Sequence, residues 1–463
     1  MNANDWFANN SNTPRPFANA NQWGADLGGP IFKNKTFFYV DYEGLRYVLP
    51  TVQNTFIPTP FYRDGVLADI AATQPASLPL YQKLFGVWLG APGAQNAVPS
   101  TEFDCPSIYS QDANGNYTSN SPYFPTPAPG ALPSPCVQNF IATPNSHSNE
   151  WILAGRLDQN IGINDRIFFR YRMDRGDQAT YTDPINANFD ATSKQPSYDG
   201  QLNWTRTISP TMTNQFLATA TWYSAPFVQD EAKAVGTFPF DVTFSGWSFT
   251  NFARLRSFPQ GRNVTQYQFI DDFSTIHGNH SLKFGANFRR YNVSDHNFFY
   301  RYPRLLITDL LSFADGTVGS SGYVRQDFGP NNVVAPIALY GLGFYAQDEW
   351  RVKTSLKLTL ALRAERNANP TCRNNCFSRL TGPFDTLTHG SAIPYNQNVT
   401  TGLAHPYYGV DYINFSPRFG FTWSPLGDDK TVISGVSGSS TTRSHKVWWN
   451  RHSRTCRATL ISA

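Results

Sequence analysis

The chain has 463 residues and a formal net charge of only +4, so charge gives no reason to expect a nucleic-acid partner. Charged residues make up 15 %, below the roughly 25 % of soluble domains, while aromatic residues also reach 15 %. This composition, with 33 Gly and 33 Pro, favours strands and turns over helices. No apolar run approaches the length of about 18 residues that a membrane-spanning helix needs, which excludes a helical membrane protein but not a β-barrel.

Six pairs of segments with alternating apolar and polar residues follow one another along the chain. The clearest pair is 340–352 with 356–365, where every second residue is apolar and only Asp348 breaks the apolar row. Such alternation predicts strands, and the short turns between paired segments predict hairpins. The other pairs surround Lys33 to Lys35, the GINDR turn after Leu157, Ser209-Pro210-Thr211, His277 to His280, and the SPLGDDKT segment after Trp423.

The connections between these hairpins are long and polar. They run from about 25 residues, Gly176 to Asp199, to about 100 residues, Tyr47 to Asn149. Strands of about ten to thirteen residues, tilted by about 40°, cross the roughly 25 Å apolar band of an outer membrane. The sequence therefore predicts an all-β fold, an antiparallel transmembrane β-barrel with long extracellular loops. The alternative, a soluble β-sandwich or propeller, would bury its apolar rows against a second sheet.

Several phrases of the sequence, taken in order, resemble one receptor family. They are GADLGGPIFKNKTFFYVDYEGLR, NHSLKFGANFRR, GLGFYAQDEWRV followed by SLKLTLALRAE, and INFSPRFGFTWSP. Together they resemble the barrel of Oar-like TonB-dependent outer-membrane receptors of the acidobacterial type. The resemblance implies a 22-stranded barrel with an N-terminal plug, coupled to the TonB complex, of which about 12 strands are present here.

On that basis we divide the chain into three parts. Residues 1–18 are expected to end an upstream junction between plug and barrel, and 19–436 to form a partial barrel with a long loop at 48–149. Residues 437–463 are basic and lack alternation, so we interpret them as an aberrant, frameshifted tail rather than a functional one. The opening MNANDWFANN has neither the basic segment nor the apolar segment of a secretory signal, so we expect the start of an exported protein to lie upstream. No TonB box or plug is recognisable.

Four of the five cysteines lie in predicted loops, namely Cys105, Cys136, Cys372 and Cys376. We expect them to form two disulfides in an oxidising exterior, with the connectivity left open; unpaired thiols are the alternative. The spacing of Cys372 and Cys376 also fits a metal ligand pair, but no second pair lies nearby, so no metal is predicted.

Motifs that resemble chemical sites have simpler interpretations. The segment Gly29 to Thr36 resembles a phosphate-binding loop, but Asn34 replaces its second glycine and a strand follows. Gly341 and Gly343 lie inside a strand, and His277 and His280 lie in a turn without further ligands. We therefore predict no catalytic residue, no cofactor and no enzyme activity.

Two groups of side chains are candidates for contact with lipid or ligand. Charged residues on the polar strand face either line a watery lumen or are simply solvated; they include Arg170, Arg172, Arg289, Glu349, Arg363 and Glu365. Tryptophans near the strand ends fit the aromatic belts at the membrane interfaces, namely Trp151, Trp204, Trp222, Trp350 and Trp423. Loop aromatics either contact an extracellular ligand or pack on one another. The candidates for ligand contact are Trp247, Tyr323, Tyr407 and Tyr408, and Tyr62, Trp88 and Phe252 belong to the same ambiguous group.

Two functions from different classes fit the sequence. The first is energy-coupled uptake of a nutrient such as a carbohydrate or peptide, with outer-membrane lipid, the TonB complex and an extracellular substrate as partners and the cell outer membrane as location. The second is a surface adhesion or structural protein whose long loops bind. A secreted soluble β-protein is a weaker third.

Overall fold

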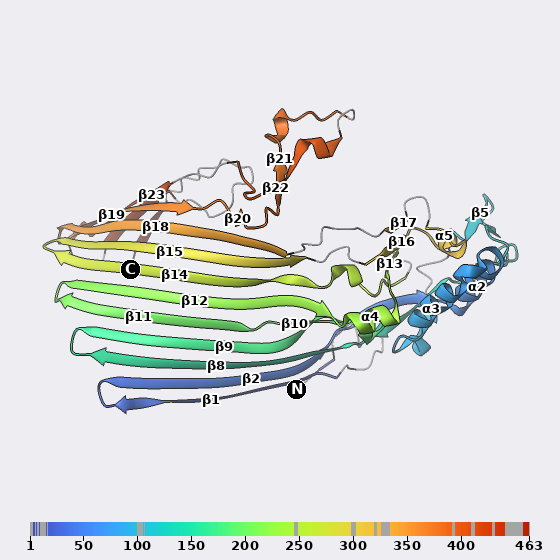
Figure 1. Ribbon diagram of the computed structural model, residues 1–463, viewed down its shortest axis with the longest axis horizontal. Helices are drawn as coiled ribbons and strands as arrows, with labels where there is room; N and C mark the ends of the chain where they lie inside the picture. Colours follow the sequence, from blue (N-terminus) through green and yellow to red (C-terminus); the bar gives the residue numbers. More distant parts are fainter. Residues whose placement is uncertain are drawn as a thin grey trace.

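The computed structural model describes residues 3–4, 6, 9, 15, 17–99, 105, 107–244, 249–297, 302–318, 322–325, 334–390, 394–408, 413–427, 431–439 and 457–462. Its main feature is one large antiparallel sheet in which twelve long strands form six hairpins (Figure 1). The hairpins are β1 (Asn19–Phe32) with β2 (Thr36–Pro50), β8 (Asn145–Ile161) with β9 (Asp165–Tyr181), β11 (Ser197–Ser209) with β12 (Met212–Gln229), β14 (Gln260–His277) with β15 (His280–Asn297), β18 (Val334–Lys353) with β19 (Leu356–Asn367), and β23 (Asn414–Trp423) with β24 (Thr431–Gly438). The predicted fold class and the predicted hairpins are confirmed.

Short turns gather at one end of the sheet and long connections at the other. The turns are 33–35, 162–164, 210–211, 278–279, 354–355 and the one that begins at Ser424, and they lie together at the left of Figure 1. Asn34 adopts φ +63° in the first of them, so the segment that resembles a phosphate-binding loop is a hairpin turn. In outer-membrane barrels the short turns face the periplasm and the long loops face outward.

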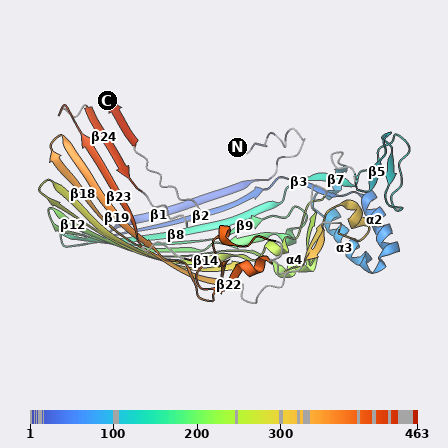
Figure 2. The ribbon, with the colours of Figure 1, turned by 90° about the horizontal axis from the view of Figure 1, so that it is seen from above.

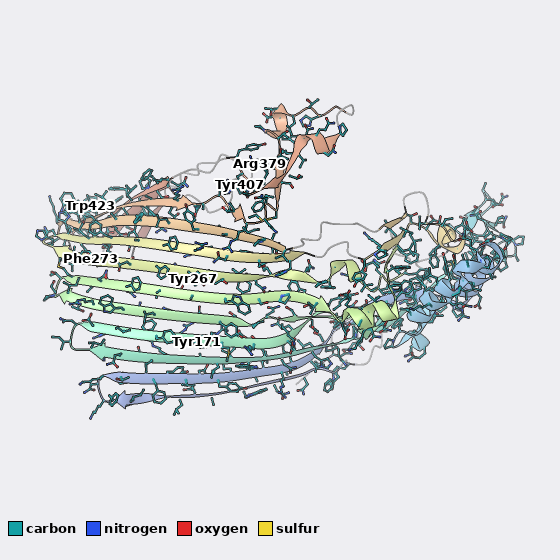
Figure 3. The ribbon with its side chains drawn as sticks, in the orientation of Figure 1. Tyr171, Tyr267, Phe273, Arg379, Tyr407 and Trp423 are labelled. Carbon is teal, nitrogen blue, oxygen red and sulfur yellow. A yellow bond between two sulfur atoms is a disulfide. The ribbon has the colours of Figure 1, made fainter. Side chains whose placement is uncertain are left out.

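The strand register places the apolar side chains of neighbouring strands in continuous rows. One row joins Leu157, Phe169, Leu202, Ala218 and Phe269 across five strands. Phe169 and Phe269 remain 48 % and 45 % exposed, although they are large apolar residues. Because a soluble sheet would bury such a row, this face is built to contact lipid. Figure 3 shows Tyr171, Tyr267, Phe273 and Trp423 of the same face along the sheet.

Aromatic residues form two belts on this apolar face. Trp204, Trp350 and Trp423 lie near the turns, and the second belt, which lies nearer the loops, contains Tyr42, Trp151, Tyr198, Trp222, Tyr267 and Tyr340. Positions 340 and 350 of β18 are about 33 Å apart along a strand, or about 25 Å at a tilt of about 40°. The two belts are therefore separated by about one apolar membrane band.

The sheet is curved and open. Seen from above, its later strands rise out of the plane of the first ones (Figure 2). In the part of the chain that the structure describes, no ladder joins β1 to β24 or β25 (Arg457–Ser462), and β25 pairs only with β24. Most of the tail predicted to be aberrant, 440–456, lies outside the described residues.

The bounds predicted for two connections are wrong, because the strands on either side run beyond the membrane band. The strands β9 and β11 extend to Tyr181 and from Ser197, so the connection predicted from Gly176 to Asp199 is only 182–196. It carries β10 (Ala191–Lys194), which pairs with β9 and β12. The predicted loop at 48–149 is likewise reduced to 51–144. The apolar and polar alternation fades in these strand extensions, because both of their faces lie outside lipid.

The long connections are themselves folded. They contain helices α2 (Pro60–Thr73), α3 (Leu78–Leu89), α4 (Glu231–Thr237) and α5 (Leu310–Ala314). Their short strands are β3 (Gln53–Pro58), β4 (Val98–Pro99), β5 (Tyr109–Gln111), β6 (Tyr117–Ser119), β7 (Val137–Ala142), β13 (Asp241–Phe244), β16 (Arg304–Ile307), β17 (Tyr323–Arg325), β20 (Thr371–Cys372), β21 (Phe377–Leu380) and β22 (Val399–Leu403). The connections predicted as long polar loops therefore contain regular secondary structure of their own.

Candidate functional site

The face opposite the apolar rows is polar and carries paired charges. Arg172 Nη2 lies 2.8 Å from Asp174, and Arg170 Nη2 lies 3.6 Å from Asp199 on the neighbouring strand. Further pairs join Lys357 to Glu349 and Arg363 to Glu365. All the predicted polar-face charges lie on this side. Only a wet environment suits such a row of charges, since an ion pair in hydrocarbon carries a large desolvation penalty.

The side chain of Tyr345 on β18 extends across Gly285 on the neighbouring strand to reach Asp272 on the strand beyond it. Its Oη donates a 2.8 Å hydrogen bond to Asp272 on β14, passing over Gly285 on β15. A Cβ at Gly285 would overlap both the Tyr345 ring and the Asp272 carboxylate. Glycine at this position therefore leaves the space for a contact that holds three strands together.

We expect Gly285→Ala to turn Tyr345 away and break its hydrogen bond, lowering sheet stability by about 1–3 kcal/mol. The matched control is Gly29→Ala, because a Cβ at Gly29 meets nothing within 4 Å. Denaturant unfolding in detergent measures both variants. Equal stability of the two would contradict this role for Gly285.

A pocket of about 650 Å³ and one of about 380 Å³ lie on opposite faces of the sheet. The smaller one lies on the polar face near the loops, between β12, β14, β15 and β18. Val264, Val293 and Leu339 form apolar parts of its wall, and Tyr223 and Arg262 add an aromatic ring and a cation. Arg262 is itself 3.7 Å from Asp295. This combination of apolar wall and a few polar groups is typical of ligand pockets.

This pocket was not predicted from the sequence. Its signal is the alternation at the loop ends of the strands, where Thr221 and Tyr223 share a face, as do Gln266 and Val264. Nearby, Arg289 lies on the same face as Tyr291, and its Nε has no hydrogen-bond partner in the residues described. The pocket is thus a polar and aromatic site close to the loop end of the sheet.

The connections 51–144, 182–196, 230–259 and 302–318 together bury one apolar cluster, which we call the loop core. Trp88 is fully buried there, with its ring centroid 5.2 Å from Phe249, 5.4 Å from Phe252 and 6.3 Å from Phe313. Its Nε1 donates to Thr250 O at 3.2 Å. These partners come from two other connections, 230–259 and 302–318, so Trp88 joins three connections into one folded unit.

Hydrogen bonds between connections support the loop core. Tyr62 Oη donates to Leu310 O at 2.6 Å, and Tyr81 Oη donates to Phe313 O at 2.8 Å. In α2 the Thr59 side chain accepts from Tyr62 N and caps the helix, with Pro60 at its first turn. Tyr62, Trp88 and Phe252 therefore pack inside the loops and are not exposed to a ligand.

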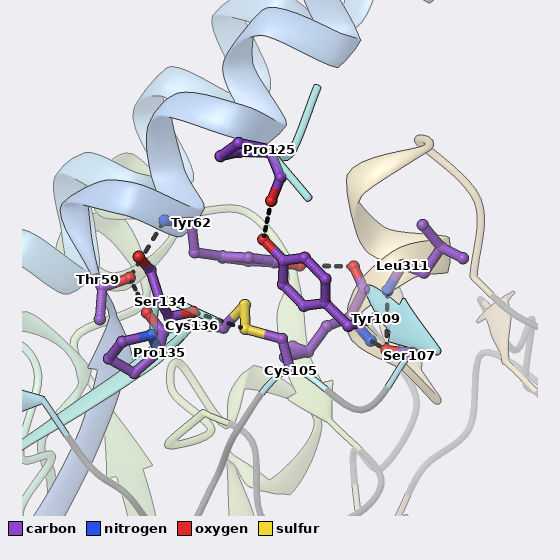
Figure 4. The surroundings of a disulfide bond; sticks show 11 residues. Thr59, Tyr62, Cys105, Ser107, Tyr109, Pro125, Ser134, Pro135, Cys136 and Leu311 are labelled. Carbon is purple, nitrogen blue, oxygen red and sulfur yellow. Dashed lines mark hydrogen bonds between the residues drawn. A yellow bond between two sulfur atoms is a disulfide. The ribbon is translucent and has the colours of Figure 1, made fainter. Parts of the chain in front are cut away.

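Cys105 and Cys136 form a disulfide inside this unit, and Cys372 and Cys376 form a second one in the connection 368–413. Figure 4 shows the first disulfide beside Thr59, whose N–H donates to Cys136 O at 2.9 Å. Both sulfurs of this first pair are buried. The cysteines of the first disulfide are 31 residues apart in the sequence, whereas those of the second are only 4 apart.

We expect the double variant Cys105→Ser and Cys136→Ser to destabilise the loop core by roughly 3–4 kcal/mol, because the open chain regains more freedom when a longer loop is released. The same change at Cys372 and Cys376 is expected to cost roughly 2 kcal/mol on the same basis and to leave the loop core intact. Proteolysis of 51–144 without denaturant measures the difference. Equal cleavage rates in the two double variants would argue against it.

Asp183 is a buried acid at the start of the connection 182–196, outside the membrane band. Burial raises its pKa to about 6, against hydrogen bonds that Tyr181 and the N–H groups of Ile185 and Asn186 donate to it. A raised carboxyl pKa means that the folded state favours the protonated form. The contribution to stability is therefore complete below the ordinary pKa of 3.8 and is lost as pH rises through about 6.

From pH 4 to 7 we expect the opening of 182–190 to become about tenfold to 100-fold more favourable. Hydrogen-exchange protection at Ile185 and Asn186, corrected for intrinsic rates, measures this. Asp183→Asn should remove most of the dependence because it keeps the side-chain shape without a titrating group; burial also raises the pKa of Asp190, which accounts for the remainder. Unchanged protection in the wild-type chain would refute the expectation.

The four predicted ligand-contact aromatics have different places. Trp247 lies outside the described residues, and only the backbone of Tyr323, in β17, is described. Arg379 connects the other two, since it donates to Tyr407 O at 2.9 Å and its Cζ lies 4.0 Å from the Tyr408 ring centroid. Figure 3 shows Arg379 and Tyr407 at the base of the arm that carries β21 and β22. Tyr408 is 60 % exposed and stays a candidate for ligand contact.

Three further predictions concern membrane-spanning helices, metal ligands and the histidines at one hairpin turn. Within the described ranges no helix is both long and apolar enough to cross a membrane. Among the same residues no group of three His, Cys, Asp or Glu side chains is arranged to hold a metal ion. His280 is not merely a solvated turn residue, because its Nδ1 lies 2.7 Å from Asp348 Oδ2.

A family model described as the outer membrane beta barrel domain matches residues 1–452. The chain belongs to this family, and it is a protein of the outer membrane.

Solved structures with similar folds include three proteins named as transporters or receptors. The outer membrane transporter YddB from Escherichia coli is 10 % identical, with 91 % of this chain and 38 % of that chain covered and a TM-score of 0.42. The ferric-catecholate import receptor Fiu from E. coli is 8 % identical, with 91 % of this chain and 49 % of that chain covered and a TM-score of 0.44. The FrpB iron transporter from Neisseria meningitidis is 10 % identical, with 91 % of this chain and 46 % of that chain covered and a TM-score of 0.38. The chain thus spans less than half of each. No curated protein sequence matches it.

Proposed function

We propose that this chain is the barrel part of a TonB-dependent receptor of the Oar-like type, which imports a nutrient such as a carbohydrate or peptide. The observation that carries the proposal is the division of the sheet into an apolar face with two belts and a polar face with paired charges. A polar inner wall serves passage of a hydrophilic solute, which a protein used only for attachment does not need. The ordered phrases of the sequence that resemble this family support the same assignment.

The folded loops fit the role of capture. The loop core fixes connections from four hairpin junctions in one unit beside the strand ends (Figure 1). Preorganised loops lose little entropy when they bind a ligand. The polar-face pocket with Tyr223 and Arg262 lies at the loop end of the sheet, where a captured solute would enter.

A growth experiment separates uptake from adhesion. The gene that contains this chain is deleted in its source cells, which then grow on single oligosaccharides or peptides as carbon source. We expect loss of growth on at least one of them, and the same loss in a strain without TonB. Normal growth on all of them, together with lost attachment to surfaces, would overturn the transport proposal in favour of adhesion.

A further inference from the structure

An acid interrupts the apolar face close to the belt at the turns. Asp348 lies between Ala346 and Trp350 on this face of β18, opposite Leu282 on one side and Leu360 on the other. A carboxylate that faces lipid is unfavourable unless the interface or a partner stabilises it. Its position two residues from Trp350 puts it just inside the boundary of the apolar band.

The neighbouring strand satisfies only half of this carboxylate. His280 Nδ1 lies 2.7 Å from Oδ2, and the His280 ring stacks on Trp350 with centroids 5.3 Å apart. Oδ1 has no hydrogen-bond partner in the part of the chain that the structure describes. Oδ1 is itself buried, but the Asp348 side chain as a whole is 23 % exposed, so a cationic group from the membrane can approach the carboxylate from the side of its other atoms.

The larger of the two pockets adjoins this carboxylate. Asp348 is part of its lining, and the apolar part of the wall consists of Leu282, Phe284, Ala346, Leu360, Leu362, Pro417 and Phe419. The groove has a simple cause in the register, where Ala346 stands between Phe284 and Leu362. A methyl group flanked by larger side chains leaves a depression that runs over β15, β18, β19 and β23.

We propose that this groove is a binding site for phosphatidylethanolamine, with one acyl chain in the apolar depression and the headgroup ammonium at Asp348. The ammonium supplies a positive charge and N–H donors to a carboxylate whose contact on the neighbouring strand is one imidazole nitrogen. The site lies at the turn end of the sheet, so the lipid belongs to the periplasmic leaflet. The proposal is independent of the uptake function, since the groove lies on the opposite face from the charged wall.

Other phospholipids fit the site less well. Phosphatidylglycerol offers hydroxyl groups but no cation, and phosphatidylcholine has a cation without N–H donors. Both keep the acyl chain that the groove accepts. The headgroup preference therefore depends on Asp348, and the acyl contribution depends on the space above Ala346.

Native mass spectrometry of the purified full-length chain in detergent tests the site. It is titrated separately with dilauroyl phosphatidylethanolamine, phosphatidylglycerol and phosphatidylcholine. We expect the first to bind at least tenfold more tightly than the other two. Asp348→Asn should reduce this preference to less than twofold. Ala346→Leu, which fills the depression, should weaken the binding of all three.

Asp271→Asn is the matched control, because Asp271 lies on the same face outside the groove and accepts a hydrogen bond from Asn214 at 3.0 Å. It should leave the preference unchanged. Equal binding of the three lipids by the wild-type chain, or an undiminished preference in Asp348→Asn, would overturn the proposal. Growth on the carbon sources above remains a separate readout of uptake.

Discussion

Replacing Trp88 by Ala is expected to unfold the loop core while the sheet remains intact. The indole contacts rings from two other connections and donates to Thr250 O, so the variant loses apolar burial and leaves a cavity. Such a change costs about 3–5 kcal/mol. Hydrogen exchange followed by mass spectrometry should show faster exchange in 51–144, 230–244 and 302–318.

The control for this variant is Leu132→Ala in the same connection, because Leu132 is 81 % exposed. It should leave exchange unchanged. If Trp88→Ala exchanged no faster than this control, the loops would not depend on a shared core. If exchange also rose throughout the long strands, the loops and sheet would unfold together.

The second large effect concerns the apolar face of β9. Phe169→Arg places a charge among Leu157 and Leu202, with lipid in front of it, and should destabilise the folded barrel by about 2–4 kcal/mol. The yield of folded protein in the outer membrane and its denaturant midpoint measure the effect.

Phe168→Arg is a closely matched control, since it changes the same residue type one position away. Phe168 faces the polar side, where Arg156 lies 4.1 Å from its ring centroid and Asp158 is its cross-strand neighbour. Asp158 already pairs with Arg156 at 2.7 Å, so the new Arg joins a solvated group of charges and does not face lipid, and a loss of only about 1 kcal/mol is expected. A larger loss for Phe168→Arg than for Phe169→Arg would reverse the assignment of the two faces.

The sheet was predictable because each strand records its two faces in alternate residues. In β9 the apolar Phe169 and Tyr171 alternate with Arg170 and Arg172, and this local pattern needs no knowledge of the partner strand. The strand ends were predicted too short because alternation no longer separates lipid from water beyond the belts.

The loops were harder to predict because their core joins residues far apart in the chain. Trp88 meets Phe252 and Phe313, and no local period connects these three positions. The helix α2 did leave a signal, since Tyr62, Val66 and Ile70 are spaced four apart after a capping Thr59. The contact of His280 with Asp348 depends on strand register, which turn residues alone do not reveal.

A spin-label scan along β9 tests most directly whether the sheet faces lipid on one side and water on the other. Single cysteines are placed at positions 166 to 173 in a Cys456→Ser background, labelled, and studied in outer-membrane vesicles. Accessibility to oxygen should peak at Ile167, Phe169, Tyr171 and Met173, and accessibility to a water-soluble nickel complex at the positions between them. Low accessibility to both reagents at the apolar positions would contradict the barrel, because it would show a second sheet packed against them.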